Sequence, residues 1–464
     1  DAIDQKLPVV KGIASTKDSR KGGAVHYGLW AGAQRKYSGK THCISYTDAD
    51  LSTHLGQSGL LLDGILNKGK DGVVGSRRAR EAVMVKSGGR NTRGKLHAYL
   101  WKQMMPEICY VVDTQTAFKA FRADVVEALT ADLMERTMSF DLELLLKAQL
   151  RAGTPNALGQ AGICWKDSEA ESTSGSSGGY VVLLQQMAAI YRHYLPKDDW
   201  RESFARFIDS LTGEAFDKLL VNTPKSIEQR DAAQYASPDT VSAEEMAQHC
   251  GLAQVQGPSA GAADGMGDEP LAVFLRLGES KGVCEKIQDL AVDDLDLTIP
   301  AYELQVRCAA DLLIKEHVTR DALEALRERL VLKKSDYKYF THLCVVLALS
   351  KVIVQNMVKV KKTFHLTTLF AVYGETNRIK TKEEHPNGED FLITKIAQLR
   401  WLFDGVPESN GSWDILIVDD GCPDGSGEAC ARVAAERGGG APVEVLYLQD
   451  AIDQKLPVVK GIAS

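Results

Sequence analysis

Asp48 and Asp50 stand one residue apart at the end of the apolar segment 41–47, which has the composition of a buried strand. Carboxylate oxygens are the ligands that Mg²⁺ and Mn²⁺ prefer, and such an ion commonly joins protein carboxylates to substrate phosphates. The pair therefore predicts a site for Mg²⁺ or Mn²⁺ with a phosphate-bearing ligand. An isolated Asp-x-Asp on a solvated loop is the alternative.

A second pair of carboxylates, Asp419 and Asp420, follows the apolar segment 414–418 and precedes a glycine-rich turn into a helical stretch. Ligands of open α/β sheets bind outside the carboxyl ends of the strands. A carboxylate at that edge can accept hydrogen bonds from a nucleotide base or a ribose. The segment therefore predicts a nucleotide site.

The sequence Arg-Lys-Gly-Gly-Ala at 20–24 begins another helical stretch. Free N–H groups at a helix start, here at Gly22 and Gly23, together with the ammonium group of Lys21, suit a bound diphosphate. An ordinary glycine-containing turn is the alternative for these three residues.

The strands and helices around these groups must hold them in place. In this sequence strands alternate with helices of 10–15 residues, a pattern that indicates βαβ units in a parallel sheet. The C-terminal series consists of strand 364–373, helix 389–403, strand 414–418, helix 426–437 and strand 443–448. The N-terminal series consists of helix 23–36, strand 41–47 and further strands near 72–75 and 109–112.

The first fifteen residues recur without change at 450–464. With one copy removed, joining the two ends makes a single α/β series out of two incomplete ones. We interpret the chain as circularly permuted, with a parent order of roughly 266–464 followed by 16–265. The old ends would meet in the Gly/Ala/Pro-rich linker 256–270. A tandem gene whose ends are identical by chance is the alternative.

The remaining segments, 179–251 and 271–361, carry apolar residues at helical spacing and predict two added helical regions. The expected core is then 364–464 plus 1–166. Within the second region, 343–354 is apolar but too short to span a bilayer, and a buried helix is expected there.

Composition narrows the class of protein. The 464 residues exceed one ordinary core, and the net charge of -7 argues against a nucleic-acid partner. Nine cysteines without a CxxC pair suggest neither a zinc site nor a disulfide framework, and free thiols suit a reducing cytoplasm. A cytoplasmic location is therefore the expectation.

Six short motifs occur in one order along the rejoined series. They are VDDGCPDGSG (418–427), RKGGAVHYGL (20–29), TDAD (47–50), VGSR (74–77), VDTQTAFKAFR (112–122) and SFDLELL (139–145). This set resembles the family 2 glycosyltransferases of the GT-A fold, an α/β Rossmann-like nucleotide-sugar-binding sheet, and is nearest to the polyprenyl-phosphate sugar transferases. The resemblance covers about 364–464 plus 16–166 and leaves the helical regions out.

The resemblance implies a nucleotide-sugar donor and assigns roles to matching residues. The assigned positions are Val372, Tyr373, Glu375, Asp419 and Asp420 at the nucleotide, Asp48 and Asp50 at the metal, Arg77 in the Gly-Ser-Arg motif, and Asp141 as the general base with Asp113 as second choice. Two departures are visible. The proline and asparagine usual after the first strand are absent, and Thr116 and Ala117 replace Cys-Gly in the family's DTQCGFK.

The resemblance implies a metal-dependent, inverting transfer of a hexose, expected to be glucose, from a UDP-sugar. A bound cation would stabilise the leaving diphosphate, and a carboxylate would take the acceptor's proton unless the acceptor is already ionised. The acceptor, a small molecule or a lipid phosphate, is not identified. The alternatives are a GDP-mannose user, a sugar-phosphate nucleotidyltransferase and a non-catalytic scaffold on a transferase core. Exchange of the repeated ends could also give a homodimer.

Overall fold

The computed structural model describes residues 8–10, 13–85, 89–167, 177–230, 235, 241–251, 287–288, 295–316 and 319–453. The linker expected at 256–270 lies outside these residues. So does most of the fifteen-residue repeat, of which residues 8–10, 13–15 and 450–453 are described. The exchange of the repeated ends, which would form a dimer, involves segments that also lie largely outside the described residues.

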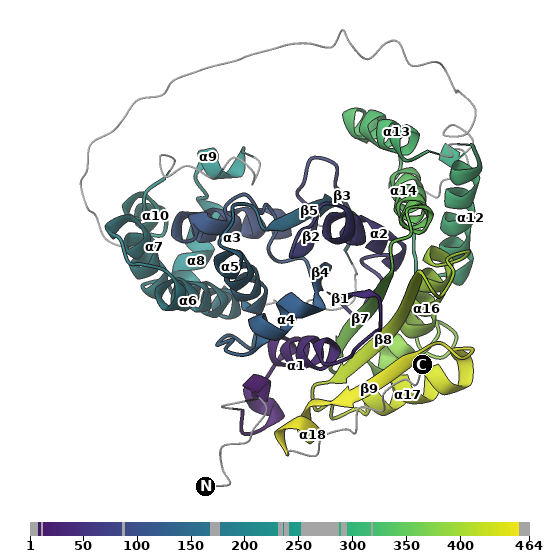
Figure 1. The fold of residues 1–464 in the computed structure, drawn as a ribbon. Helices are drawn as coiled ribbons and strands as arrows, with labels where there is room; N and C mark the ends of the chain where they lie inside the picture. The colour runs from purple at the N-terminus through teal and green to yellow at the C-terminus, as the bar shows by residue number, and fades with distance from the viewer. Residues whose placement is uncertain are drawn as a thin grey trace.

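A seven-stranded sheet forms the centre of the fold (Figure 1). Its strands, in spatial order, are β5 (Leu158–Gly162), β2 (Gly72–Ser76), β4 (Lys119–Arg122), β1 (Thr41–Thr47), β7 (Phe364–Val372), β8 (Gly411–Asp419) and β9 (Val443–Tyr447). Strand β4 is antiparallel to both of its neighbours, and the other pairs are parallel. The predicted α/β class with a mostly parallel sheet is confirmed.

The two ends of the chain meet in the middle of this sheet. Strand β1 pairs in parallel with β7 over its whole length, from Thr41 opposite Phe364 to Thr47 opposite Phe370. The prediction that the segments 41–47 and 443–448 share one sheet is therefore confirmed. The N-terminal and C-terminal segments supply complementary strands of one sheet.

The strand predicted near 109–112 is wrong. Residues Pro106–Ile108 form a 3₁₀ helix, and a turn follows before β4 begins at Lys119. The Asp113 carboxylate accepts hydrogen bonds from the backbone N–H of Gln115 and the hydroxyl of Thr116. Such local side-chain bonds favour turns over strand pairing, so the apolar run does not pair.

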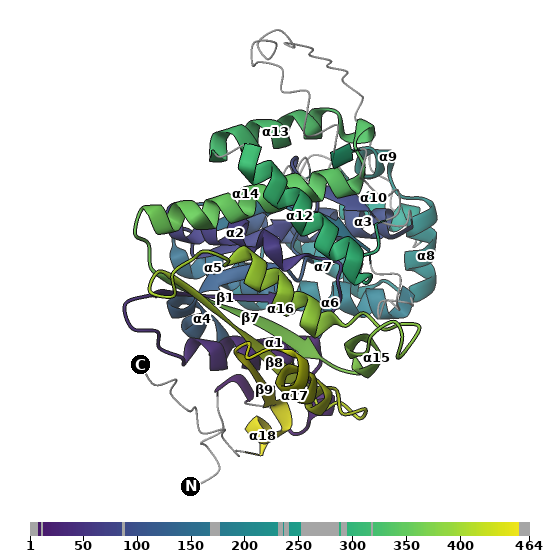
Figure 2. The same cartoon turned by 90° about the vertical axis from the view of Figure 1, so that its right-hand side faces the viewer.

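Alternate residues of β8 belong to two different cores. Leu416 and Val418 pack on the side of α1 (Lys21–Ala33), and Ile415 and Ile417 pack on the opposite side. This alternation follows from the two-residue period of a strand. The opposite side is covered by α2 (Ser58–Leu62), α12 (Pro300–Glu316), α14 (Tyr339–Lys359), α16 (Phe391–Leu402) and α17 (Ser426–Arg437), several of which lie in front of the sheet in Figure 2.

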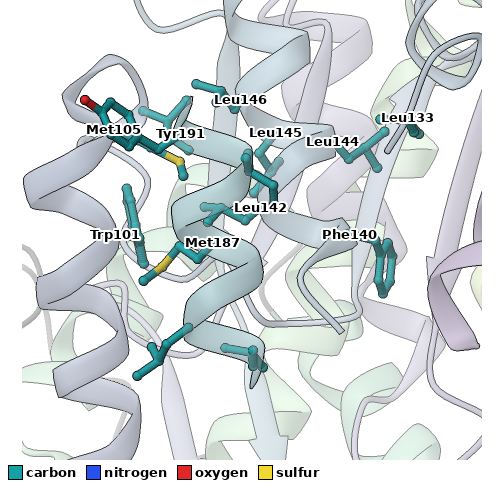
Figure 3. Close-up of a cluster of buried hydrophobic side chains, with 14 of the residues drawn as sticks. Trp101, Met105, Leu133, Phe140, Leu142, Leu144, Leu145, Leu146, Met187 and Tyr191 are labelled. Atoms are coloured by element: carbon teal, nitrogen blue, oxygen red, sulfur yellow. The ribbon is translucent and has the colours of Figure 1, made fainter. Parts of the chain in front are cut away.

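The first added helical region shares a core with the sheet domain. Figure 3 shows Trp101, Leu142 and Met187 gathered between α3 (Gly89–Met104), α5 (Phe140–Ala152) and α6 (Ser177–Tyr194). Further helices of this region continue the same core and are α7 (Asp199–Asp209), α8 (Gly213–Val221), α9 (Lys225–Glu228) and α10 (Ala243–His249). Helices α6, α7 and α9 therefore pack directly on α3, and α6 also packs on α5.

The second added region also packs on the sheet domain. Helix α14 contacts α12, α2 and α13 (Arg320–Leu332) and is buried along most of its length. Its most apolar window has a mean hydropathy of 1.5, which makes α14 long and apolar enough to cross a membrane, and 83% of that window is buried inside the fold. The buried helix expected at 343–354 is confirmed.

Candidate functional site

A cleft of about 1030 Å³ opens beyond the carboxyl ends of β1, β7 and β8. Nine of the residues assigned from the sequence line it, and they come from both ends of the chain: Lys21, Asp48, Asp50, Arg77, Asp113, Val372, Tyr373, Glu375 and Asp420. Gly22, Gly23, Asp141 and Asp419 do not line it. The pairing of β1 with β7 is what brings the first group together.

The Asp-x-Asp pair occupies the turn after β1. One oxygen of Asp50 accepts hydrogen bonds from the N–H of Ser52 at 3.1 Å and from its hydroxyl at 2.5 Å, which fixes the orientation of the carboxylate. The Asp48 carboxylate is paired with the ammonium group of Lys21. Helix α1 and strand β1 thus present a cation and two carboxylates to the same end of the cleft.

The two carboxylates differ in electrostatic environment. Burial and the negative charge of Asp48 raise the pKa of Asp50. Burial also works against ionisation of Asp48, but the Lys21 ammonium outweighs it and lowers the pKa of that group. Repulsion between two close carboxylates is relieved by a bound cation, so this pair favours one.

Asp48 and Asp50 suit a cation that is also bound by a ligand's oxygens better than one bound by protein side chains alone. Among the residues that the structure describes, no group of three or more His, Cys, Asp or Glu side chains could hold a metal. Asp48 and Asp50 would supply two carboxylate ligands, and phosphate oxygens and water would have to complete the shell. Mg²⁺ is usually bound in that way, through one or two carboxylates and substrate phosphates.

The start of α1 does not offer free amides to a diphosphate, so this part of the sequence interpretation is wrong. The N–H of Gly22 donates to Thr137 O at 3.2 Å, and the N–H of Gly23 donates to Arg136 O at 2.9 Å. A Cβ at Gly22 would lie 2.6 Å from the carbonyl carbon of Arg136. The glycines therefore allow close backbone packing, and the residues of this segment that line the cleft are Arg20 and Lys21.

Asp419 and Asp420 have different roles although they are adjacent. Asp419 accepts hydrogen bonds from the N–H groups of Gly421, Cys422 and Gly427 at 2.8 Å each, so it holds the loop between β8 and α17. Asp419 does not line the cleft, so this arrangement lends no support to its predicted contact with a nucleotide. Asp420 lines the cleft instead.

Asp420 is the buried carboxyl group with spare hydrogen-bonding capacity at this edge. It is 5% exposed, and its Oδ1 atom has no hydrogen-bond partner in the described part of the chain. Burial raises its pKa to about 7, and the charge of Asp419 adds to the shift. An unsatisfied buried oxygen is costly, so this atom favours a ligand that donates a hydrogen bond.

Arg77, which follows β2, is locked by Asp113. Its Nε donates to Asp113 Oδ2 at 2.8 Å and its Nη2 donates to Oδ1 at 2.9 Å. The Arg77 guanidinium holds the pKa of the buried Asp113 carboxyl far below its usual range, against the effect of burial. Asp113 therefore positions Arg77 and is not a free base, which corrects the second-choice assignment.

Asp141 is also engaged by neighbours. Its Oδ1 accepts a hydrogen bond from the ammonium group of Lys119 at 2.5 Å and another from the hydroxyl of Tyr46. Its charge influences both Lys21 and Arg77, so it lies beside the cleft even though it does not line it. Action as a base would require Asp141 to give up its contact with Lys119.

The segment after β7 also lines the cleft. Tyr373 is 61% exposed, and the Glu375 carboxylate pairs with Arg378 at 2.9 Å. Burial raises the pKa of Glu375. The backbone carbonyl of Val372 accepts a hydrogen bond from Asp420 N at 3.1 Å, so this segment and Asp420 form one wall.

Several cleft residues were not recognised in the sequence. They are Arg78, Arg93, His97 and Trp101 before or within α3, Trp165 in β6 (Cys164–Lys166), which pairs with β3 (Val83–Val85), and Tyr180 in α6. The second arginine of Gly-Ser-Arg-Arg was a visible signal. Nothing in the sequence placed α3 and α6 beside the cleft.

The arrangement combines the Asp48 and Asp50 carboxylates, several arginine side chains and the buried carboxyl group of Asp420 in one cleft at the edge of a mostly parallel sheet. Such a set can hold an anionic ligand that also donates hydrogen bonds. No protein-family model, curated protein or solved structure matches the chain. A functional proposal therefore depends on the geometry and on the sequence motifs.

Proposed function

We propose that the chain is a metal-dependent, inverting glycosyltransferase of the GT-A fold that moves a hexose from a UDP-sugar to an acceptor. The observation that carries the proposal is the meeting of Asp48 and Asp50 with Asp420 in one cleft, although they are about 370 residues apart in the chain. A nucleotide diphosphate sugar needs a cation site for its diphosphate and polar groups for its nucleoside. This cleft offers both.

The topology supports the proposal. Numbered from β7 in the rejoined order, the sheet reads 3-2-1-4-6-5-7, with the sixth strand antiparallel. The order reverses between β7 and β1, and ligands of doubly wound sheets bind at the carboxyl ends of the strands at such a point. Asp48 and Asp50 follow β1, and Val372 and Tyr373 end or follow β7. The cleft lies at this position.

The nucleoside would lie against the wall of Val372, Tyr373 and Asp420. Asp420 Oδ1 would accept a hydrogen bond from the base or the ribose. The diphosphate would lie near Asp48 and Asp50, where a bound Mg²⁺ or Mn²⁺ supplies Lewis-acid stabilisation of the leaving group. Lys21, now paired with Asp48, would add a second positive charge beside the diphosphate.

The acceptor would approach from the side of Arg77 and Asp141. Asp113 keeps Arg77 oriented into the cleft through its two hydrogen bonds. A hydroxyl acceptor needs a base on the face opposite the leaving group, and Asp141, beside the cleft, is the carboxylate that would take this role. An acceptor that is already ionised would need no base.

Thermal unfolding with UDP-glucose and GDP-mannose, each with and without MnCl₂, tests the proposal, since a ligand that binds only the folded state raises stability. We expect Mn²⁺-dependent stabilisation by UDP-glucose that is lost in Asp50→Asn. Larger stabilisation by GDP-mannose would change the donor to that nucleotide. No stabilisation by either donor would support the non-catalytic scaffold.

A further inference from the structure

Lys21 and Asp48 join the start of helix α1 to the turn after strand β1. The Lys21 ammonium group contacts Asp48 Oδ1, and the two side chains, which line the cleft, are 35% and 38% exposed. Burial opposes a charge on Lys21, but the carboxylates of Asp48 and Asp141 raise its pKa, so the ammonium group is charged at pH 7. A positive charge therefore lies on one of the two carboxylates proposed as metal ligands.

The Asp50 carboxylate has a different setting. It forms no ion pair within the described ranges, and its Oδ1 accepts hydrogen bonds from the N–H and the hydroxyl of Ser52. Asp50 is thus oriented without a competing cation, whereas Asp48 is paired with one. A divalent ion that binds both carboxylates must therefore compete with Lys21.

The backbone of Lys21 is fixed, while its side chain can move. The N–H groups of the next two residues, Gly22 and Gly23, donate to the carbonyl oxygens of Thr137 and Arg136, which holds the start of α1 in place. A lysine side chain has a flexible four-carbon stem and a compact ammonium group, and this one is partly exposed. Displacement of Lys21 from Asp48 therefore requires a change of rotamer and no movement of the helix.

Two other cations near the pair are held more firmly. Two nitrogen atoms of Arg77 donate to the Asp113 carboxylate. Lys119 is fully buried and donates to Asp141 at 2.5 Å. Removing either cation from its partner would leave a buried carboxylate unpaired, which is costly. Of these three cations, Lys21 is therefore the one that can change partners.

A divalent cation at Asp48 would repel the ammonium group of Lys21, because charges in such close contact interact strongly. A metal ion that arrives alone must displace Lys21 from its partner without offering it another. A nucleotide diphosphate changes this balance. Its oxygens can bind the metal and can also accept charge-assisted hydrogen bonds from the displaced ammonium group. Metal and diphosphate should therefore strengthen each other's binding.

We infer that Lys21 is an internal counter-ion of the metal site, which prevents tight binding of Mg²⁺ or Mn²⁺ until a nucleotide diphosphate accepts its ammonium group. The inference rests on the proposed function for the metal and the diphosphate. Coupling between two ligands is reciprocal, so Lys21 also makes the binding of the nucleotide more dependent on the metal. The divalent ion then enters with the donor rather than before it.

The experiment measures Mn²⁺ binding to the full chain, without and with UDP, by electron paramagnetic resonance of the free ion. We expect Lys21→Met to bind Mn²⁺ alone about tenfold more tightly than the wild type, since coupling between sites typically amounts to about 5–150-fold. The gain in Mn²⁺ affinity on addition of UDP should fall by a similar factor. Lys21→Arg keeps the charge and should keep the weak binding of Mn²⁺ alone.

Lys17→Met is the matched control, because Lys17 is an exposed lysine that lines the same cleft and forms no ion pair within the described ranges. It removes the same charge and should change the Mn²⁺ affinity by less than about twofold, since solvent and salt screen an exposed charge. A double variant, Lys21→Met with Asp50→Asn, locates the ion, and the tight binding should be lost in it. Unfolding temperatures show whether each variant is folded.

Equal affinity of the wild type and Lys21→Met for Mn²⁺ without UDP would overturn the inference. Equal tightening in Lys17→Met, or tight binding that survives Asp50→Asn, would overturn it as well. Cooperative binding of UDP and Mn²⁺ that is unchanged in Lys21→Met would overturn the inference and leave the proposed function standing. Tighter Mn²⁺ binding in Lys21→Met without any binding of UDP would support the counter-ion and overturn a UDP-sugar as the donor.

Discussion

Arg77 and Asp113, which both line the cleft, form a bidentate ion pair with Nε 2.8 Å from Oδ2 and Nη2 2.9 Å from Oδ1. The backbone N–H of Arg77 also donates to Oδ2 at 2.9 Å. Two parallel hydrogen bonds from a planar guanidinium to a carboxylate hold both groups in one relative orientation. The pair therefore fixes the direction in which Arg77 points, and it removes Asp113 from the list of free bases.

Loss of Asp113 should destabilise the fold. Asp113→Asn leaves Arg77 partly buried without its charge partner, and breaking a buried pair commonly costs about 3–5 kcal/mol. We expect a loss of about 2–4 kcal/mol in urea unfolding on that basis. Asp124→Asn is the control, because Asp124 is exposed in its pair with Arg122 and should cost less than about 1 kcal/mol. Equal effects of the two changes would contradict a positioning role.

Asp50→Asn should remove the effect of Mn²⁺ on donor binding while the fold stays intact. Burial and Asp48 raise the pKa of Asp50, so a neutral side chain at this position relieves repulsion and should not lower stability. Calorimetry with UDP in the presence and absence of Mn²⁺ measures the effect. Donor binding that keeps its full Mn²⁺ dependence in this variant would exclude Asp50 as a metal ligand.

The raised pKa of Asp420 makes a pH dependence of stability testable. Its pKa is about 7 in the fold against an ordinary value of 3.8, so the unfolded state releases the proton first as the pH rises. The ionised group then destabilises the fold increasingly between about pH 4 and pH 7. Asp420→Asn should therefore raise the unfolding temperature more at pH 8 than at pH 4.

Thermal scans of the wild type and Asp420→Asn at both pH values measure this difference. A variant that gains no more at pH 8 than at pH 4 would show that Asp420 titrates normally. The same variant should still bind UDP, since a neutral amide oxygen can accept the hydrogen bond expected of Asp420.

Asp141→Asn should lower donor hydrolysis, in which water is the acceptor, by about a hundredfold if Asp141 is the general base. The change also leaves the buried Lys119 without its partner, so stability should fall as well. Lys119→Met combined with Asp141→Asn should recover stability and not hydrolysis. Recovery of both in the double variant would assign Asp141 a structural role.

The strands were predictable because they are continuous apolar runs that end in polar turns. Strand β1 was predicted with both of its ends, and the segments of β7, β8 and β9 were predicted within a few residues. Asp48, Asp50 and Asp420 were predictable as cleft residues, because carboxyl ends of parallel strands meet at one edge of a sheet.

Other parts of the site could not be predicted from the sequence. Tertiary contacts decide whether each of these residues binds a ligand or holds the fold together. Asp419 and Asp420 look alike in the sequence, but three backbone N–H groups bind only the first. Gly22 and Gly23 resembled an anion site, yet the carbonyls of residues 136 and 137 bind their amides. The part of the cleft that α3 and α6 line depends on a packing of helices that no local pattern describes.

The parallel pairing of β1 with β7 leads to a final prediction about chain order. A rearranged chain that runs from 287 to 453 and continues with 5–251 restores one copy of the repeat between β9 and α1, and it omits 252–286. All seven strands of the sheet are retained. The rearrangement closes the connection between β9 and α1 and opens the one between 251 and 287. Loop-closure entropy depends only weakly on loop length, so the stability of the fold should change little.

We expect the rearranged chain to unfold cooperatively within a few degrees of the original and to bind UDP with Mn²⁺. The separate segments 16–251 and 287–453 should not fold alone, because each would leave the edge formed by β1 or β7 unpaired. Circular dichroism and calorimetry of the three chains measure this. A cooperative transition in either separate segment would contradict a single shared core, since a segment with a complete core of its own would not need the β1–β7 pairing.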